Sequence, residues 1–255
     1  MDSKWIKFGA VGIVGFCLLT PASYAKQSQS YFRYQGALNI PYKINIHYPR
    51  FSKGSKYFNI NSLMLKKINR FMNWYFGDLA LSKIRYSEKS SPRYTISGTY
   101  KLWKTRYYAA VKMNLSAYAA GAAYPLGYIE TLNYSLIYKR PITLASLFKT
   151  NISPNYLGVL SHYTRWYLKR RGITGSTMME GTARTARNFR AWNLSKMGLV
   201  VYFEDGQVGP HAIGQPAVLI KTKYLYKYLS SIGHYYLRLN INDDTGQKPG
   251  RYGDE

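Results

Sequence analysis

The 255-residue chain is poor in cysteine and in acidic side chains, and both shortages restrict its chemistry. Cys17 is the single cysteine, so internal disulfides and multi-cysteine metal sites are excluded. Only 11 Asp and Glu residues accompany 36 Lys and Arg residues, a net charge of +25. Glycosidases usually place two carboxylates around the scissile bond. Between residues 26 and 242 the one adjacent pair is Glu204 and Asp205, and the following Gly206 favours a turn rather than a catalytic arrangement.

Histidine is also sparse, which weighs against metal sites and serine esterases. His47, His162, His211 and His234 lie far apart and lack the spacing of paired metal ligands. The chain has no Gly-x-Ser-x-Gly elbow, although a non-standard arrangement of serine, histidine and acid stays open. The sequence therefore predicts no metal, no cofactor and no assignable catalytic residue. An envelope hydrolase, either an esterase or a peptidoglycan-active enzyme, is kept as the alternative function.

No apolar run reaches the roughly 20 residues of a membrane-spanning helix. The run from Phe8 to Leu19 follows Lys4 and Lys7 and precedes Ser23-Tyr24-Ala25, a pattern typical of a signal peptide cleaved after Ala25. We therefore expect a periplasmic or secreted protein, with an uncleaved N-terminal anchor as the alternative.

The positive charge predicts an anionic partner. Removal of residues 1–25 leaves 34 basic and 10 acidic residues, a net charge of +24. Such a field attracts polyanions. Outside the cytoplasm these are envelope polymers, anionic lipid headgroups and extracellular nucleic acid. We expect a binding domain that recognises an anionic polymer, a glycan or a protein through a basic, tyrosine-rich surface. A structural envelope protein and a secreted factor acting on a host are further alternatives.

Hydrophobic periodicity predicts an α+β fold, with antiparallel sheets packed against a few helices. Alternation of apolar and polar residues predicts a strand over 42–48 and a hairpin whose two strands meet at Lys104-Thr105-Arg106. Helical spacing predicts a helix capped by Asn61 and closed by Gly77.

The C-terminal half shows weaker signals for the same fold class. The sequence predicts a helix over 155–168 and a loop over 173–187. It also predicts strands over 198–203 and 217–220, and a helix over 221–232 that ends at Gly233. The polar segment 243–255 is predicted to be a tail.

Three ordered motifs carry a resemblance to a known family. Gly121-Ala122-Ala123-Tyr124-Pro125 precedes a strand, Ile142-Thr143-Leu144 begins a short helix, and Pro210, Ala212 and Gly214 form a late loop. With the strand Ile44-Asn45-Ile46-His47-Tyr48-Pro49, these motifs resemble the extracytoplasmic C-terminal domain and N-terminal companion domain of RsiV-type anti-sigma factors, which also occur in PdaC-type peptidoglycan deacetylases.

The resemblance implies an extracytoplasmic domain and two subdomains, 26–116 and 117–242. Tyr124 stands where the family usually has His, so no role for an imidazole is implied there. Lysozyme is a weaker partner candidate, because a chain of this charge repels basic lysozymes.

Six residues are candidates for ligand binding. Tyr118 and Tyr124 are hypothetical stacking platforms for sugar rings, His211 a loop contact, and the series Lys169, Arg170 and Arg171 a contact for an anionic polymer. Each also fits a purely structural interpretation: packing for the tyrosines, a backbone contact for the histidine and a solvated helix end for the cations.

Overall fold

The structure is a computed structural model that describes residues 28–30, 42–81, 94–119, 122–151 and 155–238. The larger sheet contains, in spatial order, β1 (Ser28–Ser30), β2 (Tyr42–Tyr48), β3 (Tyr94–Lys104), β4 (Tyr108–Ala119), β5 (Leu126–Ser135) and β6 (Arg140–Pro141). The smaller sheet contains β7 (Trp192–Ser195), β8 (Gly198–Tyr202) and β9 (Ala217–Lys221). Neighbouring strands are antiparallel except β2 and β3.

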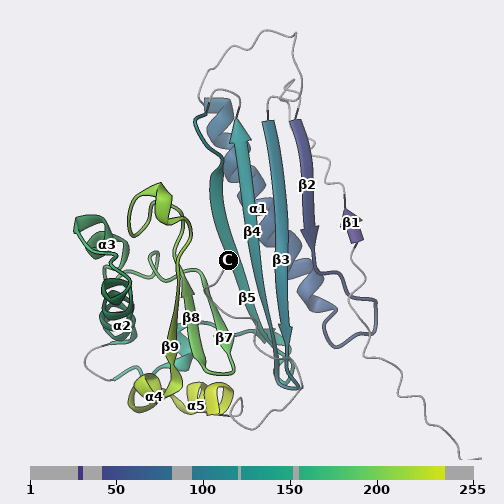
Figure 1. The fold of residues 1–255 in the computed structure, drawn as a ribbon. Coiled ribbons are helices and arrows are strands. Elements are labelled where there is room, and N and C mark those ends of the chain that lie inside the picture. Colours follow the sequence, from purple (N-terminus) through teal and green to yellow (C-terminus); the bar gives the residue numbers. More distant parts are fainter. Residues whose placement is uncertain (1–27, 31–41, 82–93, 120–121, 152–154, 239–255) are drawn as a thin grey trace, which may run out of the picture.

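Helices lie on the outer sides of the two sheets (Figure 1). The α-helices are α1 (Asn59–Leu81), α2 (Tyr156–Arg170), α3 (Ser176–Gly181), α4 (Thr222–Leu225) and α5 (Ser231–Arg238). Three short 3₁₀ helices complete the set: η1 (Ala145–Leu147), η2 (His211–Ile213) and η3 (Tyr226–Tyr228). The predicted α+β class with mostly antiparallel sheets is confirmed.

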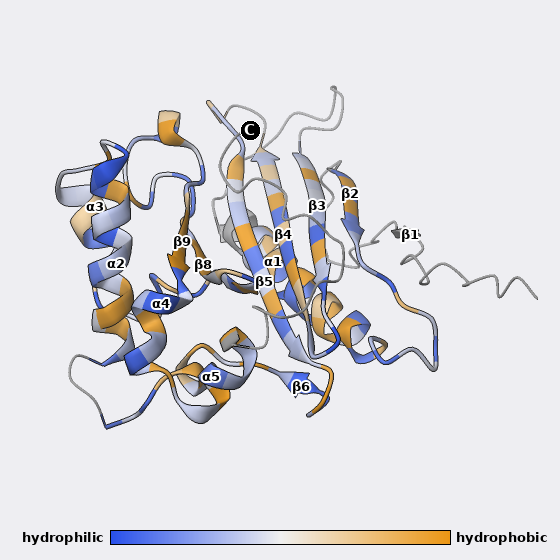
Figure 2. Cartoon of the chain, turned by 60° about the horizontal axis from the view of Figure 1, so that its bottom comes forward, coloured by the Kyte–Doolittle hydropathy of each residue, from blue (hydrophilic) through white to orange (hydrophobic). Residues whose placement is uncertain are grey.

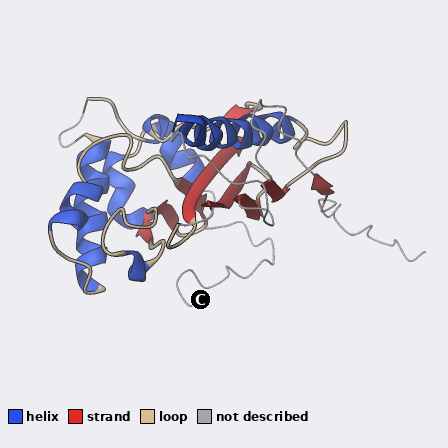
Figure 3. Cartoon of the chain, turned by 90° about the horizontal axis from the view of Figure 1, so that it is seen from above, coloured by secondary structure: helices blue, strands red, loops and turns tan. Residues whose placement is uncertain are grey.

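Helix α1 packs against one face of the larger sheet, as the view from above shows (Figure 3). Its buried side chains recur every three or four residues and meet alternate residues of β2 to β5. Burial of an apolar side chain contributes about 1.5–3 kcal/mol, so this layer is a major source of stability. The helix contributes Ile60, Met64, Ile68, Phe71, Met72 and Tyr75.

The smaller sheet is covered on both faces. Leu199 and Val201 of β8 belong to the core that contains Leu160 of α2, whereas Val200 and Tyr202 pack against Ile129 of β5. All five residues of β8 are buried. Hydrophobic colours accordingly run along β8 and β9, while colours alternate along β3 to β5 (Figure 2).

Buried amides join the two sheets. The Asn133 side chain on β5 donates to the Trp192 carbonyl at 3.0 Å and accepts from the Leu194 N–H at 2.9 Å. It also accepts from Asn193 Nδ2 at 3.2 Å. These bonds fix β7 across the end of β5, on the face of the larger sheet that α1 does not cover.

The remainder of that second face carries polar side chains, and we call it the open face. Register places these residues on the side opposite the α1 core, because their strand neighbours Ile44, Ile96 and Met113 point into it. The open face comprises Lys43, Asn45, Ser97, Thr99, Lys101, Lys112, Asn114, Ser116 and Tyr118.

Several predicted elements are confirmed. The strand over 42–48 and the hairpin at Lys104-Thr105-Arg106 form as predicted. The helix predicted over 155–168 corresponds to α2, which Asn155 caps by accepting from the Gly158 N–H at 3.0 Å. The strands over 198–203 and 217–220 correspond to β8 and β9.

Other predictions about the helices are wrong. The first helix begins at Asn59 and continues through Gly77. Asn61 therefore lies inside it, where its side chain bonds to the backbone of Phe51 at 2.8 and 2.7 Å. Residues 173–187 contain α3 rather than only a loop. The single helix expected over 221–232 is instead α4, η3 and α5, and Gly233 lies within α5.

Some predictions fall outside the described residues. These are the signal peptide over 1–25 and the tail over 243–255. The subdomain boundary between residues 116 and 117 falls within β4 and stays a prediction. In the described part of the chain, no helix has the length and apolar character needed to cross a membrane.

Candidate functional site

Two of the six candidate residues, Tyr124 and His211, meet at the start of β5. The Tyr124 Oη atom lies 2.8 Å from His211 Nε2, and His211 Nδ1 lies 3.0 Å from Asp205 Oδ2. A neutral imidazole with its proton on Nδ1 donates to Asp205 and accepts from the Tyr124 hydroxyl. We call these three residues the Tyr–His–Asp cluster. Asp205 and His211 both come from the connection between β8 and β9, whereas Tyr124 comes from the segment before β5.

Glycines allow these loops to approach one another. Gly206 has φ +74°, which completes the turn after β8, and a Cβ there would lie 3.4 Å from the His211 ring. A Cβ on Gly127 would lie 2.8 Å from the Gln215 amide. The loop that carries His211 is therefore packed closely on the first residues of β5.

The cluster is open to solvent, which limits its chemistry. Tyr124 is 53% exposed and the His211 side chain 52%, whereas Asp205 is 23% exposed. The second carboxylate oxygen of Asp205, Oδ1, is buried without a hydrogen-bond partner. That oxygen is out of reach of a ligand, whereas the exposed tyrosine ring offers a face for stacking.

Glu204, adjacent to Asp205 in sequence, is used to hold the fold together. It forms an ion pair with Arg190 and accepts from the Ile129 N–H at 3.3 Å. Arg190 also donates to the Ile129 carbonyl at 3.1 Å and lies 4.1 Å from the centre of the Tyr128 ring. Burial raises the pKa of Glu204, and Arg190 opposes that rise. The two neighbouring acids thus have different partners and do not form a glycosidase pair.

The second candidate region surrounds the exposed side of α2. We call it the α2 surface, and it comprises Arg165, Trp166, Lys169, Arg170, Arg184 and Tyr224. A pocket of about 330 Å³ lies within it, lined by Trp166, Arg165, Lys169 and Arg184 together with residues of α2 and α3. Trp166 is 41% exposed and its ring lies 6.3 Å from that of Tyr224.

The cations of the α2 surface are held without acidic partners. Arg165 Nε donates to Thr182 Oγ1 at 2.9 Å, and its Nη2 donates to the Met179 carbonyl at 2.8 Å. Arg170 lies 4.9 Å from the centre of the Trp166 ring. The three ion pairs found among the described residues involve none of these cations. The surface therefore keeps a net positive charge beside aromatic rings.

The remaining candidate residues have distinct positions. Lys169 lines the pocket, and Arg170 lies against Trp166 at its edge. Arg171 instead donates to the Ala217 carbonyl at 2.7 Å and so ties the end of α2 to β9. Tyr118 lies half-buried on the open face, paired in register with Thr95, and no described contact joins it to Tyr124.

The sequence analysis did not identify Arg165, Trp166, Arg184, Tyr224 or Asp205 as candidates. The spacing of His162, Arg165, Trp166 and Lys169 by three and four residues places them on one face of a helix, a signal that was available. Asp205, Arg184 and Tyr224 come from other elements, so only the fold brings them into contact.

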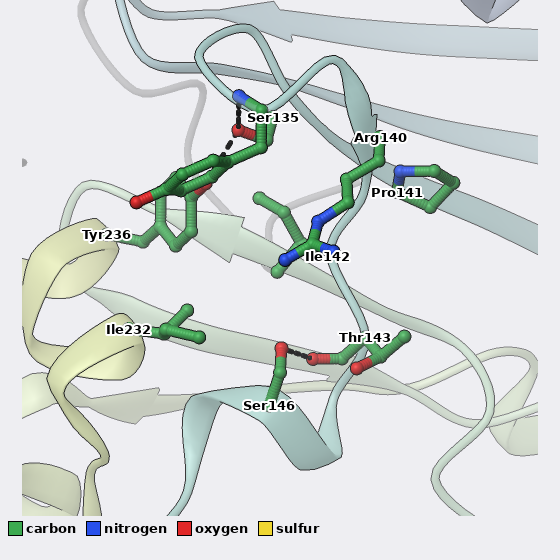
Figure 4. Close-up of a pocket in the computed structure, with 9 residues that line it drawn as sticks. Ser135, Arg140, Pro141, Ile142, Thr143, Ser146, Ile232 and Tyr236 are labelled. Atoms are coloured by element: carbon green, nitrogen blue, oxygen red, sulfur yellow. Dashed lines mark hydrogen bonds between the residues drawn. The ribbon is translucent and has the colours of Figure 1, made fainter.

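A larger pocket of about 610 Å³ lies between β6, η1 and α5 (Figure 4). Its buried wall contains a hydrogen bond of 2.7 Å from the Tyr236 hydroxyl to Ser135 Oγ, which also accepts from the Tyr138 N–H at 3.0 Å. Arg140 is its cation, and its guanidinium lies 5.6 Å from the centre of the Tyr138 ring. The described lining residues include no carboxylate and no imidazole.

The described residues contain no group of three or more His, Cys, Asp or Glu side chains that could hold a metal ion. His211 and Asp205 are two such ligands, one fewer than the usual protein set of a catalytic zinc site.

Part of the C-terminal half matches a known family model. Residues 145–223 match the family described as "Protein of unknown function (DUF3298)". None of the curated proteins matches the chain. Two solved structures cover 74% of this chain and 85% of their own: a DUF3298 family member from Bacteroides fragilis, 17% identical with a TM-score of 0.49, and a DUF3298 family protein from Pseudomonas aeruginosa PAO1, 10% identical with a TM-score of 0.53. The second shows a shared fold.

Proposed function

We propose that this protein is an extracytoplasmic binding domain of the bacterial cell envelope that holds an anionic glycan on the α2 surface. The uncompensated cations beside Trp166 carry this proposal. A linear polysaccharide with carboxylate or phosphate groups offers sugar rings for stacking and charges for Lys169 and Arg184.

The arrangement of Arg165 supports a binding role. Its two hydrogen bonds to neutral oxygens fix the guanidinium while its charge remains uncompensated. Because the side chain is already ordered, a ligand that bonds to the remaining N–H groups loses less conformational entropy on binding. A fixed arginine without an acidic partner favours recognition of an anion over a role in stability alone.

The proposal is tested with polygalacturonate, which combines sugar rings with carboxylates, and with polyphosphate, which has charges alone. We expect the purified protein to bind polygalacturonate more tightly, and 0.5 M salt to weaken both complexes because exposed charges are screened. Binding that is unaffected by salt contradicts the electrostatic part of the proposal. Equal affinity for polyphosphate contradicts the glycan part.

Matched variants locate the site. Lys169→Met and Trp166→Ala remove a charge and a ring from the α2 surface, and each is expected to lower affinity about fivefold or more, the scale of one polar or stacking contact. Lys66→Met removes the same charge from the exposed side of α1 and is the control. If Lys66→Met weakens binding as much as Lys169→Met, the effect is due to net charge and the α2 surface is not the site.

The Tyr–His–Asp cluster is the observation that favours the alternative, an envelope hydrolase. Asp205 orients His211, and an oriented imidazole is the base of many esterases. The His211 side chain is more than half exposed, which counts against this function because acyl transfer needs a site that excludes water. Hydrolysis of p-nitrophenyl acetate that is lost in His211→Ala and retained in the control His162→Ala would favour the hydrolase.

An extracytoplasmic location is part of the same proposal. The sequence of residues 1–25 supports it, as does the resemblance to RsiV-type domains. N-terminal sequencing of the protein recovered from expressing cells is expected to begin at Lys26. An N-terminus at Met1 in a membrane fraction would instead favour the uncleaved anchor. Lysozyme stays the weaker partner, because a net charge of +24 repels basic lysozymes.

A further inference from the structure

Two lysines face each other across β3 and β4 on the open face. Lys101 and Lys112 are direct register partners, so their Cβ atoms lie about 4.5–5.5 Å apart as in any directly opposed antiparallel pair. Like charges at directly opposed positions destabilise a sheet. Lys101 is exposed and Lys112 is half-buried, where the smaller sheet meets the larger.

Among the described residues, no carboxylate forms an ion pair with Lys112. Its ammonium group lies 4.4 Å from the centre of the buried Tyr202 ring on β8. Burial and, to a lesser degree, the charge of Lys101 together lower the pKa of Lys112 from 10.5 to about 8. Among the charged groups, Lys101 is therefore the one that acts appreciably on Lys112.

The described acids are engaged or located elsewhere. Glu130 and Glu204 form ion pairs with Lys67 and Arg190, and Asp205 lies 3.0 Å from the His211 imidazole. Glu180 lies on α3, and Asp78 lies on α1, behind the opposite face of the sheet. No described carboxylate compensates the two lysines.

A second polar group on the same strand lacks a partner. Asn114 follows Lys112 by two residues on β4, which places both side chains on the same face. The Asn114 Oδ1 atom is buried and has no hydrogen-bond partner. The assignment of O and N in an amide is interchangeable, so this group can also present its N–H₂ to an acceptor.

We propose that Lys101, Lys112 and Asn114 form an oxyanion-binding site on the open face, which takes a carboxylate or phosphate group. A bound oxyanion would lie between the two ammonium groups, remove their repulsion and accept charge-assisted hydrogen bonds from both. The Tyr202 ring of the smaller sheet borders the site beside Lys112. The site is separate from the α2 surface, so the two proposals stand or fall independently.

The test measures the reactivity of individual lysines in the full chain. Acetic anhydride modifies neutral amines, and mass spectrometry reports the modification rate of each lysine at pH 8. Inorganic phosphate at constant ionic strength is expected to slow modification of Lys112 about fivefold, the fall in its neutral fraction at pH 8 when the pKa rises by about one unit from about 8. Acetate in place of phosphate shows whether the site prefers a carboxylate to a phosphate group.

Three charge-matched variants make the test specific. Lys101→Met is expected to abolish most of the protection by phosphate, because one of the two ammonium donors is lost. Lys43→Met removes the same charge from β2 on the same face and is expected to preserve the protection. Lys169→Met on the α2 surface is likewise expected to have no effect.

Three outcomes would overturn the proposal. One is an unchanged modification rate of Lys112 in both phosphate and acetate. Another is equal loss of protection in Lys101→Met and Lys43→Met, which would indicate a general field effect. The third is slow modification of Lys112 without added anion that becomes fast when the chain is cut after Asn242. The two lysines would then bind the acidic C-terminal segment of the chain itself rather than a separate ligand.

Discussion

Lys67 and Lys112 lie on opposite faces of the larger sheet, and their surroundings differ. Lys67 of α1 is 2.8 Å from Glu130 of β5, which is buried beneath the helix. Lys112 of β4 faces Lys101 and the ring of Tyr202. In a chain with few acids, the described carboxylates that form ion pairs link one element to another. Lys67 thus has a counter-charge, whereas Lys112 has none among the described residues.

The largest expected loss in the free energy of unfolding is at the part of the larger sheet that the smaller sheet covers, on the face opposite α1. Asn133→Ala removes three hydrogen bonds between the sheets and leaves the buried Trp192 carbonyl and Leu194 N–H unpaired. We expect a loss of about 3 kcal/mol in the free energy of unfolding, measured with urea. Ser97→Ala, on the uncovered part of the same face, is expected to change it by less than about 0.5 kcal/mol. Equal effects would show that the two parts do not differ.

The next effect concerns the compensated α1 face. Lys67→Met leaves the Glu130 carboxylate buried, with only the Tyr128 hydroxyl 3.5 Å away. An unpaired buried charge is costly, so we expect a loss of about 2 kcal/mol at pH 7 in urea unfolding. Lys66→Met, on the exposed side of the same helix, is the control. A loss below about 0.5 kcal/mol would mean that Glu130 finds another partner and that the pair is not needed.

Replacement of Lys112 is expected to stabilise the protein, whereas replacement of Lys67 is expected to destabilise it. Its folded pKa of about 8 is below the unfolded value of 10.5, so the unfolded state binds more protons between these values. Stability therefore rises with pH from about 8 to 9.5, below the range in which the buried tyrosines ionise. Lys112→Met is expected to remove this slope and to stabilise the protein by about 1 kcal/mol at pH 7. Urea unfolding at pH 7, 8 and 9 measures both, and an unchanged slope contradicts the assignment.

The fold was predictable wherever one face of an element is buried. The strand over 42–48 alternates because Ile44 and Ile46 meet α1 while Lys43 and Asn45 face outward. β7 gave no such signal, because all four of its residues are buried and alternation is lost. A segment covered on both sides looks the same in sequence whether it forms a strand or a turn of helix.

Tertiary contacts explain the helix errors. Gly233 was predicted to end a helix, yet it lies inside α5, where a Cβ would be 2.0 Å from the Leu147 carbonyl. Its role is close packing on η1 rather than termination. The predicted helix is interrupted because Leu229 is buried and forms a β-bridge with Phe148. These contacts span about 80 residues, so local propensity could not reveal them.

The candidate site was predictable only in part for the same reason. The family resemblance pointed to the loops of Tyr124 and His211, and the structure joins them at 2.8 Å. The third member, Asp205, was considered only as a partner of Glu204. The turn at Gly206 separates these neighbours, directing one to His211 and the other to Arg190.

The smallest expected effect concerns the Tyr–His–Asp cluster, whose ion pair is exposed, unlike that of Lys67 and Glu130. Tyr124→Phe removes the hydroxyl that bonds to His211, but water can replace it because both side chains are more than half exposed. We expect a change of at most about 0.5 kcal/mol in urea unfolding. Tyr236→Phe is the matched control: its buried hydroxyl bonds to Ser135 at 2.7 Å, and its loss is expected to cost about 1–1.5 kcal/mol. If Tyr124→Phe lowers the free energy of unfolding as much as Tyr236→Phe does, the cluster stabilises the fold, and a ligand-binding role for its exposed atoms is contradicted.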